Sequence, residues 1–370
     1  MFHPASRSDV QSNPFIPRQV RRTTTPPGAS DGSCSVDTQQ FAEALRGEGD
    51  EADESWRDWA RRLLDGDGLT PALLTQVWAE VVAFDDTLAE FLADPVVVPD
   101  GTVTVSGSGK ETFKTFNVST AAALLAAASG ANVVKGTSSS VSAVSGASDV
   151  LAALGLPSLT DPARIPEFTA TYGIAFVDYA SFCPRYAARY DGRFDFLSPM
   201  SFFMPAATLA VSADAFLHGL AHDDVRTAAS GIHSARPDIA RGRVVTTWIG
   251  PGQRIDELAS FGTSTSAVLQ HGAVQLVSQH SDSATGPWRR AVRHRTDHAT
   301  NAAALVESLR PDGDPAVTNL VERNAAAILA TARPGVADDE ALQLVREARL
   351  DGRAERLLPR LRTAASKGLR

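Results

Sequence analysis

The feature that most constrains this fold is a strand, a glycine turn and a helix start that occur in succession, twice, between residues 103 and 154. Val103 and Val105 alternate with polar residues as a short strand does, and the Gly-Ser-Gly at 107–109 then breaks the pattern. Asparagine, serine and threonine, which cap helices well, precede the alanine-rich run at 121–128. The free N–H groups and the dipole at such a helix start favour an anion.

The same order recurs after a short interval. Val133-Val134 is predicted to be a second short strand, followed by a Gly/Ser loop at 136–146 and a helix at 148–154. Each unit taken alone also fits a tight turn or a linker without a ligand. Two such cradles close together suit a ligand with more than one phosphate.

Composition places the chain among globular enzymes. It has 370 residues, 43% of them hydrophobic and 21% charged, with a net charge of −8 that does not favour nucleic-acid binding. Cys34 and Cys183 are the only cysteines, so no disulfide framework is expected. There is no run of eighteen apolar residues, and no apolar stretch follows the N-terminal arginines. We therefore expect neither a membrane span nor a secretory signal, and a cytoplasmic location.

Short apolar strands alternate with helical patterns, which predicts an α/β fold with a mostly parallel central sheet and helices on its faces, plus a small all-helical domain. We expect a disordered tail at 1–36, rich in Pro, Ser, Thr and Gly. The helical domain should span 37–98 with about 180–200, and the α/β domain 99–179 and 201–370. Further strands are expected at Ile174–Val177, Ala215–Leu220, Val244–Ile249 and Ala273–Val277.

At several motifs the chain resembles the anthranilate phosphoribosyltransferase family, in the group that includes the pyrimidine nucleoside phosphorylases. The likeness extends from about residue 37 to 365. The family's Gly-Thr-Gly-Gly-Asp turn would fall on Gly107 to Glu111, and its Asn-x-Ser-Thr motif on Asn117, Ser119 and Thr120. Its Lys-His-Gly-Asn-Arg loop would fall on Lys135 to Ser139, and its Asp-Glu pair on Asp256-Glu257.

The resemblance implies displacement of pyrophosphate from phosphoribosyl pyrophosphate (PRPP) by an acceptor, with Mg²⁺ and in a homodimer. It makes Lys135 and Glu111 the catalytic candidates. Implied donor-binding residues are Gly107, Ser108, Gly109, Asn117, Ser119, Thr120, Lys135, Ser145 and Gly146, and implied metal ligands are Asp256, Glu257 and Ser119. Hard carboxylate oxygens together with substrate phosphates are what Mg²⁺ prefers.

On the acceptor side the chain departs from the family. The implied acceptor-binding positions are Gly136, Ser138, Cys183 and Arg193, and the first three replace two histidines and an asparagine. We therefore expect an acceptor other than anthranilate, either an aromatic acid or amine or an amino sugar such as an aminoglycoside core, in specialised (antibiotic) metabolism. Asp178, Asp191 and Asp195 would suit a cation.

Other interpretations stay open at this point. A nucleoside phosphorylase-type reaction fits the same cradles, as does a homologue that binds a ligand or nucleic acid without catalysis. His294 and His298 have the spacing of a helical metal pair, but neighbouring arginines would repel a cation, so we expect a solvated basic face. Small-molecule partners are expected, with no nucleic acid and no membrane.

Overall fold

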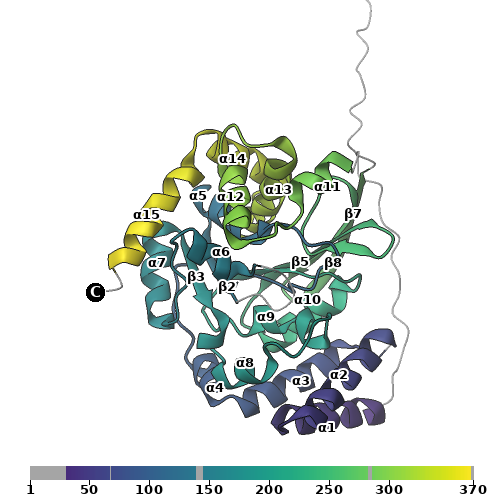
Figure 1. The fold of residues 1–370 in the computed structure, drawn as a ribbon. Helices are drawn as coiled ribbons and strands as arrows, with labels where there is room; N and C mark the ends of the chain where they lie inside the picture. Colours follow the sequence, from purple (N-terminus) through teal and green to yellow (C-terminus); the bar gives the residue numbers. More distant parts are fainter. Residues whose placement is uncertain (1–30, 67, 139–144, 282–285, 368–370) are drawn as a thin grey trace, which may run out of the picture.

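A computed structural model describes residues 31–66, 68–138, 145–281 and 286–367 of the chain. Its centre is one sheet with the strand order β3-β2-β1-β4-β5-β7-β8 and with β6 paired to β5 (Figure 1). The strands are β1 Thr102–Gly107, β2 Asn132–Thr137, β3 Ile174–Asp178, β4 Ala215–Gly219, β5 Arg241–Gly250, β6 Gln253–Ile255, β7 Gly262–Gln270 and β8 Ala273–Ser281.

Five strands of this sheet, from β3 to β5, are parallel neighbours, and β6, β7 and β8 add antiparallel pairs at one side. The prediction of a mostly parallel central sheet is thus confirmed. Strands β1 and β4 are buried along nearly their whole length because helices cover both faces. All parallel strands end at the same edge, and the two glycine turns lie there.

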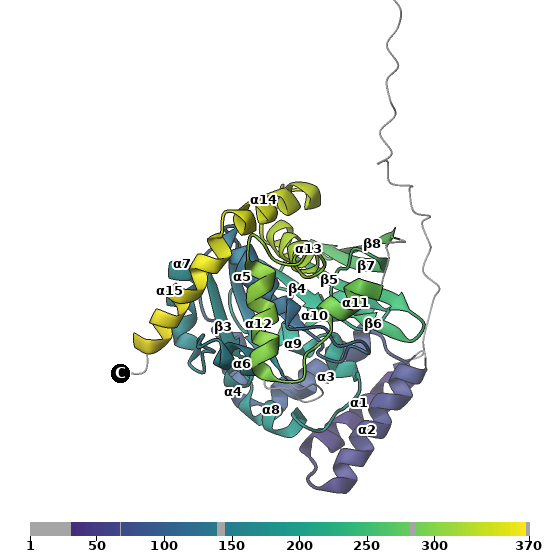
Figure 2. The same cartoon turned by 45° about the horizontal axis from the view of Figure 1, so that its top comes forward.

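Helices flank the sheet on both sides (Figures 1 and 2). On one face α5 and α13 contact β1, while on the other α9 contacts β1 and β4 and α10 contacts β5 and β7. The helices after β1 are α5 Val118–Ala128, α6 Ala147–Ala153, α7 Ile165–Tyr172, α8 Pro184–Tyr190, α9 Met204–Ala207, α10 Val225–Ala235, α11 Gly286–Val292, α12 His298–Leu309, α13 Pro315–Ala332, α14 Asp338–Leu350 and α15 Arg353–Lys367. Short 3₁₀ turns are η1 Pro162–Arg164, η2 Tyr179–Ser181 and η3 Pro199–Phe202.

Four helices precede the sheet: α1 Asp31–Arg46, α2 Asp50–Asp65, α3 Pro71–Phe84 and α4 Asp86–Ala93. Trp56 and Trp59, predicted as core from their helical spacing, are fully buried, and Phe41 packs on both rings. The same apolar cluster takes in Tyr186 and Phe194 from the segment after β3. The chain therefore returns to the helical part between β3 and β4.

Two expectations about local structure need correction. The tail predicted for 1–36 ends earlier, because α1 already begins at Asp31; residues 1–30 lie outside the described part of the chain. Strands β6 and β7 were not predicted, since β7 is rich in Ser and Thr and alternates weakly. Among the described residues no helix has the length and apolar character needed to cross a bilayer.

Candidate active site

A cavity of about 220 Å³ lies where β1 and β2 end. Its wall is built from the two glycine turns, the start of α5, the Asp256-Glu257 pair and the segment 179–205. Of the predicted donor and metal residues, those lining it are Gly107, Ser108, Gly109, Glu111, Asn117, Ser119, Lys135, Ser145, Gly146, Asp256 and Glu257. The fold thus brings together motifs that are up to about 150 residues apart in sequence.

The start of α5 faces this cavity with unpaired polar groups. Asn117 is the N-cap residue, yet its side chain makes no capping hydrogen bond, and its buried Oδ1 has no partner among the described residues. Ser119 in the first turn lines the cavity, whereas Thr120 does not and its buried hydroxyl also lacks a partner there. Because the first N–H groups of a helix are free, this end of α5 is suited to an anion.

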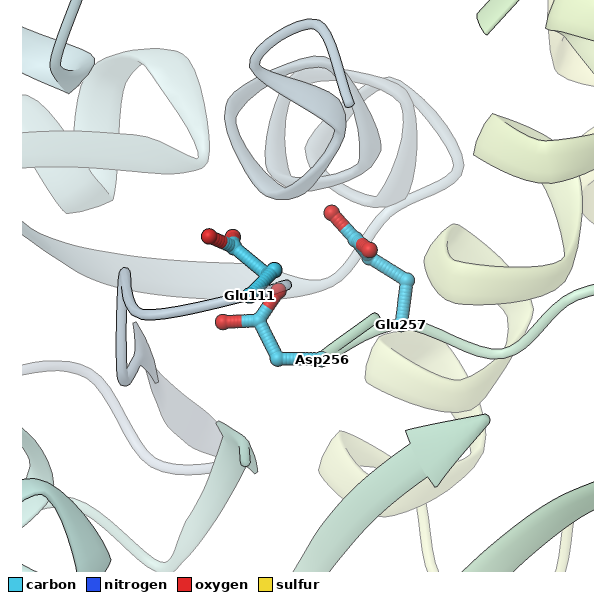
Figure 3. A group of neighbouring side chains, drawn as sticks. All are labelled: Glu111, Asp256 and Glu257. Carbon is cyan, nitrogen blue, oxygen red and sulfur yellow. The ribbon is translucent and has the colours of Figure 1, made fainter. Parts of the chain in front are cut away.

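Three carboxylates meet beside this helix start. Ligand oxygens of Glu111, Asp256 and Glu257 all lie within 4.8 Å of one another (Figure 3). Glu111 comes from the first glycine turn, and the other two follow β6. Sequence similarity marked the pair as metal ligands and Glu111 as catalytic; the fold places all three in one group. Such a set of hard oxygens could hold a divalent cation.

The electrostatics of the group are those of crowded anions. Burial raises the pKa of Asp256 well above its usual range, and Glu111 adds to the effect. Burial and then Asp256 raise the pKa of Glu257 in the same way. Burial alone would raise the pKa of Glu111, but the charge of Lys114, 2.8 Å from its Oε2, and hydrogen bonds from Asp256 and Lys114 together leave the pKa lowered. Oε2 of Glu257 is buried and has no hydrogen-bond partner among the described residues, so a bound cation would give this oxygen an interaction that it lacks.

Close backbone contacts fix where Asp256 stands. The Gly109 N–H lies 3.4 Å from Oδ2 of Asp256, with Gly109 at a positive φ of 63°. A Cβ on Gly219 would come within 2.2 Å of the Asp256 carbonyl oxygen, so only glycine fits at the end of β4. Asn324 of α13 accepts from the Leu258 N–H at 2.9 Å and donates to the Leu258 carbonyl at 3.1 Å, which anchors the same loop.

Lys135 is the buried cation of the site. It lies in the second half of β2 and is 3% exposed. Its Nζ donates to the Gly136 carbonyl at 3.2 Å. Burial lowers its pKa to about 8, and Asp256 offsets part of that loss. A lysine that lines a cavity without a close carboxylate partner is prepared to meet an anion there.

The second glycine turn is tied to the distant 294–301 segment. The Ser145 N–H donates to Nε2 of His294 at 3.2 Å, and Ser145 Oγ is 2.7 Å from Nδ1 of His298. His294 Nδ1 lies 3.1 Å from the Thr115 carbonyl. A solvated basic face was expected for these histidines. His298 is exposed, but His294 is half-buried and connects Ser145 to Thr115 in the segment before α5.

The predicted acceptor positions separate into two pairs. Gly136 and Ser138 line the cavity. Cys183 and Arg193 do not: Cys183 is fully buried with its thiol 3.5 Å from the Tyr179 carbonyl. Arg193 points to the helical part, where its Nε lies 3.0 Å from Asp53. The expectation that these two side chains meet an acceptor is corrected accordingly.

Sequence patterns left several cavity residues unidentified. The aromatic and apolar wall consists of Tyr179, Tyr186, Tyr190, Phe194, Met200 and Met204, and Asp191, which the sequence had indicated for a cation, lies beside it. The four-residue spacing of three of these rings was the available signal. Ser106 also lines the cavity, and behind it lies the fully buried His218. That pair depends on the β1–β4 register, which no local pattern reveals.

Comparison with known proteins agrees with this geometry. The family described as "glycosyl transferase family, a/b domain" matches residues 100–355, and the chain belongs to it. Within that family its relatives are anthranilate phosphoribosyltransferases, which makes it a member of the anthranilate phosphoribosyltransferase-like group. The enzyme of that name from Nocardioides sp. (strain ATCC BAA-499 / JS614) is 32% identical over 302 residues, covering 78% of this chain and 84% of the relative.

Solved structures of such enzymes share the fold. The anthranilate phosphoribosyltransferase of Thermus thermophilus superposes with a TM-score of 0.70 at 21% identity, covering 90% of this chain and 95% of that one. The Saccharomyces cerevisiae enzyme, solved in complex with PRPP and Mg, gives 0.67 at 16% identity, covering 91% and 99%.

Proposed function

We propose that this protein transfers a 5-phosphoribosyl group from PRPP to an acceptor other than anthranilate. One observation carries the donor half: the carboxylate group of Glu111, Asp256 and Glu257 lies in the same cavity as the free start of α5. A phosphate bound at this helix start would be repelled by the three nearby carboxylates unless a cation lay between them. The relatives of this chain, one of them solved with PRPP and Mg, support the same interpretation.

The residues divide the work of leaving-group stabilisation. The start of α5 and the 107–109 turn would hold phosphate oxygens, and Lys135 would add a full positive charge to them. Mg²⁺, when bound with PRPP at the three carboxylates, supplies neutralisation of charge on the departing pyrophosphate. As the C1–O bond to pyrophosphate breaks, a bond from the acceptor forms at C1 of the ribose. The protein's main task is then to keep the acceptor within attack distance.

Three observations support an acceptor other than anthranilate. Gly136 and Ser138 stand where the family resemblance implies a histidine and an asparagine, so neither offers a flat ring or an amide. Arg193, the position that resemblance assigns to the acceptor carboxylate, is paired with Asp53 instead. An aromatic amine or an amino sugar in specialised metabolism is the proposed class. The homodimer and the antibiotic pathway stay predictions.

Release of pyrophosphate from PRPP tests this function against its main alternative. With Mg²⁺ and a pool of amines and sugars, we expect at least one compound to trigger pyrophosphate release. The matched assay supplies inorganic phosphate and nucleosides, where we expect no free base. Base release in the second assay without pyrophosphate release in the first would replace the proposal with a nucleoside phosphorylase.

A further inference from the structure

The segment 179–205 forms one wall of the cavity and consists mainly of rings. Tyr186 and Tyr190 stack with centroids 5.4 Å apart and planes at 13°, and Tyr190 and Phe194 stack at 5.2 Å and 26°. Tyr186 and Phe194 are each 1% exposed. This wall offers an apolar surface to the body of a ligand.

One phenol in this wall is left without a partner. The Tyr179 hydroxyl donates to Asp191, and the Tyr190 hydroxyl lies 3.2 Å from Ser198 Oγ. The Tyr186 hydroxyl, buried in the cavity wall, bonds to none of the described residues. Burial raises the pKa of Tyr186 well above its usual range, so the group stays neutral. An unpaired buried hydroxyl is destabilising, and a hydrogen bond to a polar ligand group would offset that cost.

The charge at this wall is negative. Asp191 lines the cavity, and burial, with Asp178 adding to it, raises the pKa of Asp191. No arginine among the described residues pairs with Asp191: Arg189 and Arg193 both bind Asp53, and Arg185 donates to the Phe84 carbonyl at 2.8 Å. These arginines therefore do not offer a site for a carboxylate.

Lys110 also lines the cavity, and its charge opposes the rise that burial causes in the pKa of Asp191. Its Nζ donates to the Phe194 carbonyl, which directs the ammonium toward the protein. Burial lowers its pKa, with Lys114 adding to the effect, while Asp195, Glu111 and Asp191 oppose it. The partly buried ammonium of Lys110 already donates to a backbone carbonyl, so it offers little attraction to an anionic ligand beside Asp191. A carboxylate ligand placed beside Asp191 would meet a like charge, which disfavours it relative to a cationic ligand.

We propose that the acceptor is an amine that carries a second, protonated amino group, held at Asp191, with a polar substituent bonded to the Tyr186 hydroxyl. This inference rests on the proposed function, because it treats the tyrosine wall as the acceptor side. It selects cationic acceptors over carboxylates such as anthranilate.

Two probes of similar size and opposite charge test the charge preference. Anthranilate and 2-aminobenzylamine share the ring and the ring amine, but the second replaces the carboxylate with an aminomethyl group that is protonated at neutral pH. Each is titrated calorimetrically into the full-length enzyme with Mg²⁺ and PRPP present. We expect 2-aminobenzylamine to bind about tenfold more tightly, the usual worth of one hydrogen bond to a charged group.

Matched variants locate the effect. Asp191→Asn should reduce the preference about tenfold, whereas Asp195→Asn, on the same segment but outside the cavity lining, should leave it unchanged. A ring-hydroxylated 2-aminobenzylamine supplies the further polar substituent, and Tyr186→Phe should weaken that analogue without altering the binding of 2-aminobenzylamine or PRPP. Equal or tighter binding of anthranilate, no binding of 2-aminobenzylamine at millimolar concentration, or an unchanged preference in Asp191→Asn would overturn the inference.

A separate titration keeps the two proposals distinguishable. PRPP with Mg²⁺ is titrated without any acceptor, and the two amines are titrated without PRPP. If PRPP binds but anthranilate binds more tightly than 2-aminobenzylamine, only the inference about the charge of the acceptor is wrong. If 2-aminobenzylamine binds more tightly than anthranilate but PRPP does not bind, only the proposal that PRPP is the donor is wrong.

Discussion

Ser106 and His218 face each other across the β1–β4 ladder, with Ser106 Oγ 2.9 Å from Nδ1 of the imidazole. Nε2 of His218 lies 2.9 Å from the Ser201 carbonyl, which can only accept, so Nε2 carries the proton. Nδ1 must then accept from the Ser106 hydroxyl. The oxygen of Ser106 consequently presents only lone pairs to the cavity that it lines.

The Ser106–His218 pair should make stability depend on pH in acid. Burial lowers the pKa of His218 to about 4, with Lys135 adding to the shift. Below pH 6.5 His218 becomes protonated in the unfolded state, whereas in the folded state it stays neutral down to about pH 4. Stability is therefore full above pH 6.5 and falls between the two values, by up to about 3 kcal/mol.

Denaturant titrations at pH 7 and pH 4.5 measure this contribution. His218→Gln should lose less stability between the two pH values than the wild type does. Ser106→Ala should cost about 1–3 kcal/mol at pH 7, because it leaves Nδ1 unsatisfied. An identical pH dependence in wild type and His218→Gln would count against a neutral buried imidazole.

Lys135 should set an upper pH limit on donor binding. Its pKa of about 8 means that the ammonium is lost as pH rises through 8. PRPP affinity should then fall by up to tenfold per pH unit above that value, because bound phosphate favours the ammonium and raises its pKa in the complex. In Lys135→Ala this step should vanish, and affinity at pH 7 should fall by roughly 1.5–3 kcal/mol. Unchanged kinetics in PRPP for this variant would remove Lys135 from the donor site.

Glu257→Gln should stabilise the metal-free protein while weakening its function. A raised carboxyl pKa lowers stability above the unfolded-state value, so replacing that carboxylate relieves a cost. Gln can still accept from Thr115, which lies 2.9 Å from Oε1. We expect the melting temperature in EDTA to rise by roughly 2 °C. Addition of Mg²⁺ and PRPP should then stabilise the variant much less than the wild type.

The exposed Glu307 on α12 supplies the control for this experiment. Glu307→Gln should alter neither the EDTA melting temperature nor the response to Mg²⁺ and PRPP. If Glu257→Gln lowers the melting temperature in EDTA, the three carboxylates do not repel one another as described.

Anthranilate should be a poor substrate. Gly136 and Ser138 supply no imidazole or amide, and Arg193 is bound to Asp53, so these three positions do not fix the ring plane and the amine direction together. Steady-state assays with PRPP should give a catalytic efficiency well below about 10⁴ M⁻¹s⁻¹, the low end for working enzymes. A value at or above that level would show that anthranilate is accommodated in another way.

The residues proposed for the donor half could be identified from sequence because they belong to contiguous motifs, and their role in donor binding stays a prediction. A strand, a glycine turn and a capped helix each have a local signal, and Gly107, Asn117 and Ser119 follow from it. The Asp256-Glu257 pair was reached through family resemblance, and Glu111 joined it only once the fold was known.

The acceptor half could not be predicted in the same way. Whether Arg193 faces a ligand or Asp53 depends on how α2 packs on the segment after α8, which no local pattern encodes. His218 depends on strand register, and His294 on a contact with Ser145 across 149 residues. Long-range packing decided these three side chains.

The measurement that tests the account most directly is a calorimetric titration of PRPP into the wild-type protein with Mg²⁺, and again with EDTA in place of the metal. The three clustered carboxylates predict binding with Mg²⁺ and its loss in EDTA, with Asp256→Asn behaving in Mg²⁺ as the wild type does in EDTA. PRPP binding of equal strength with and without metal, or no PRPP binding in either condition, would contradict a metal-assisted phosphoribosyl donor site.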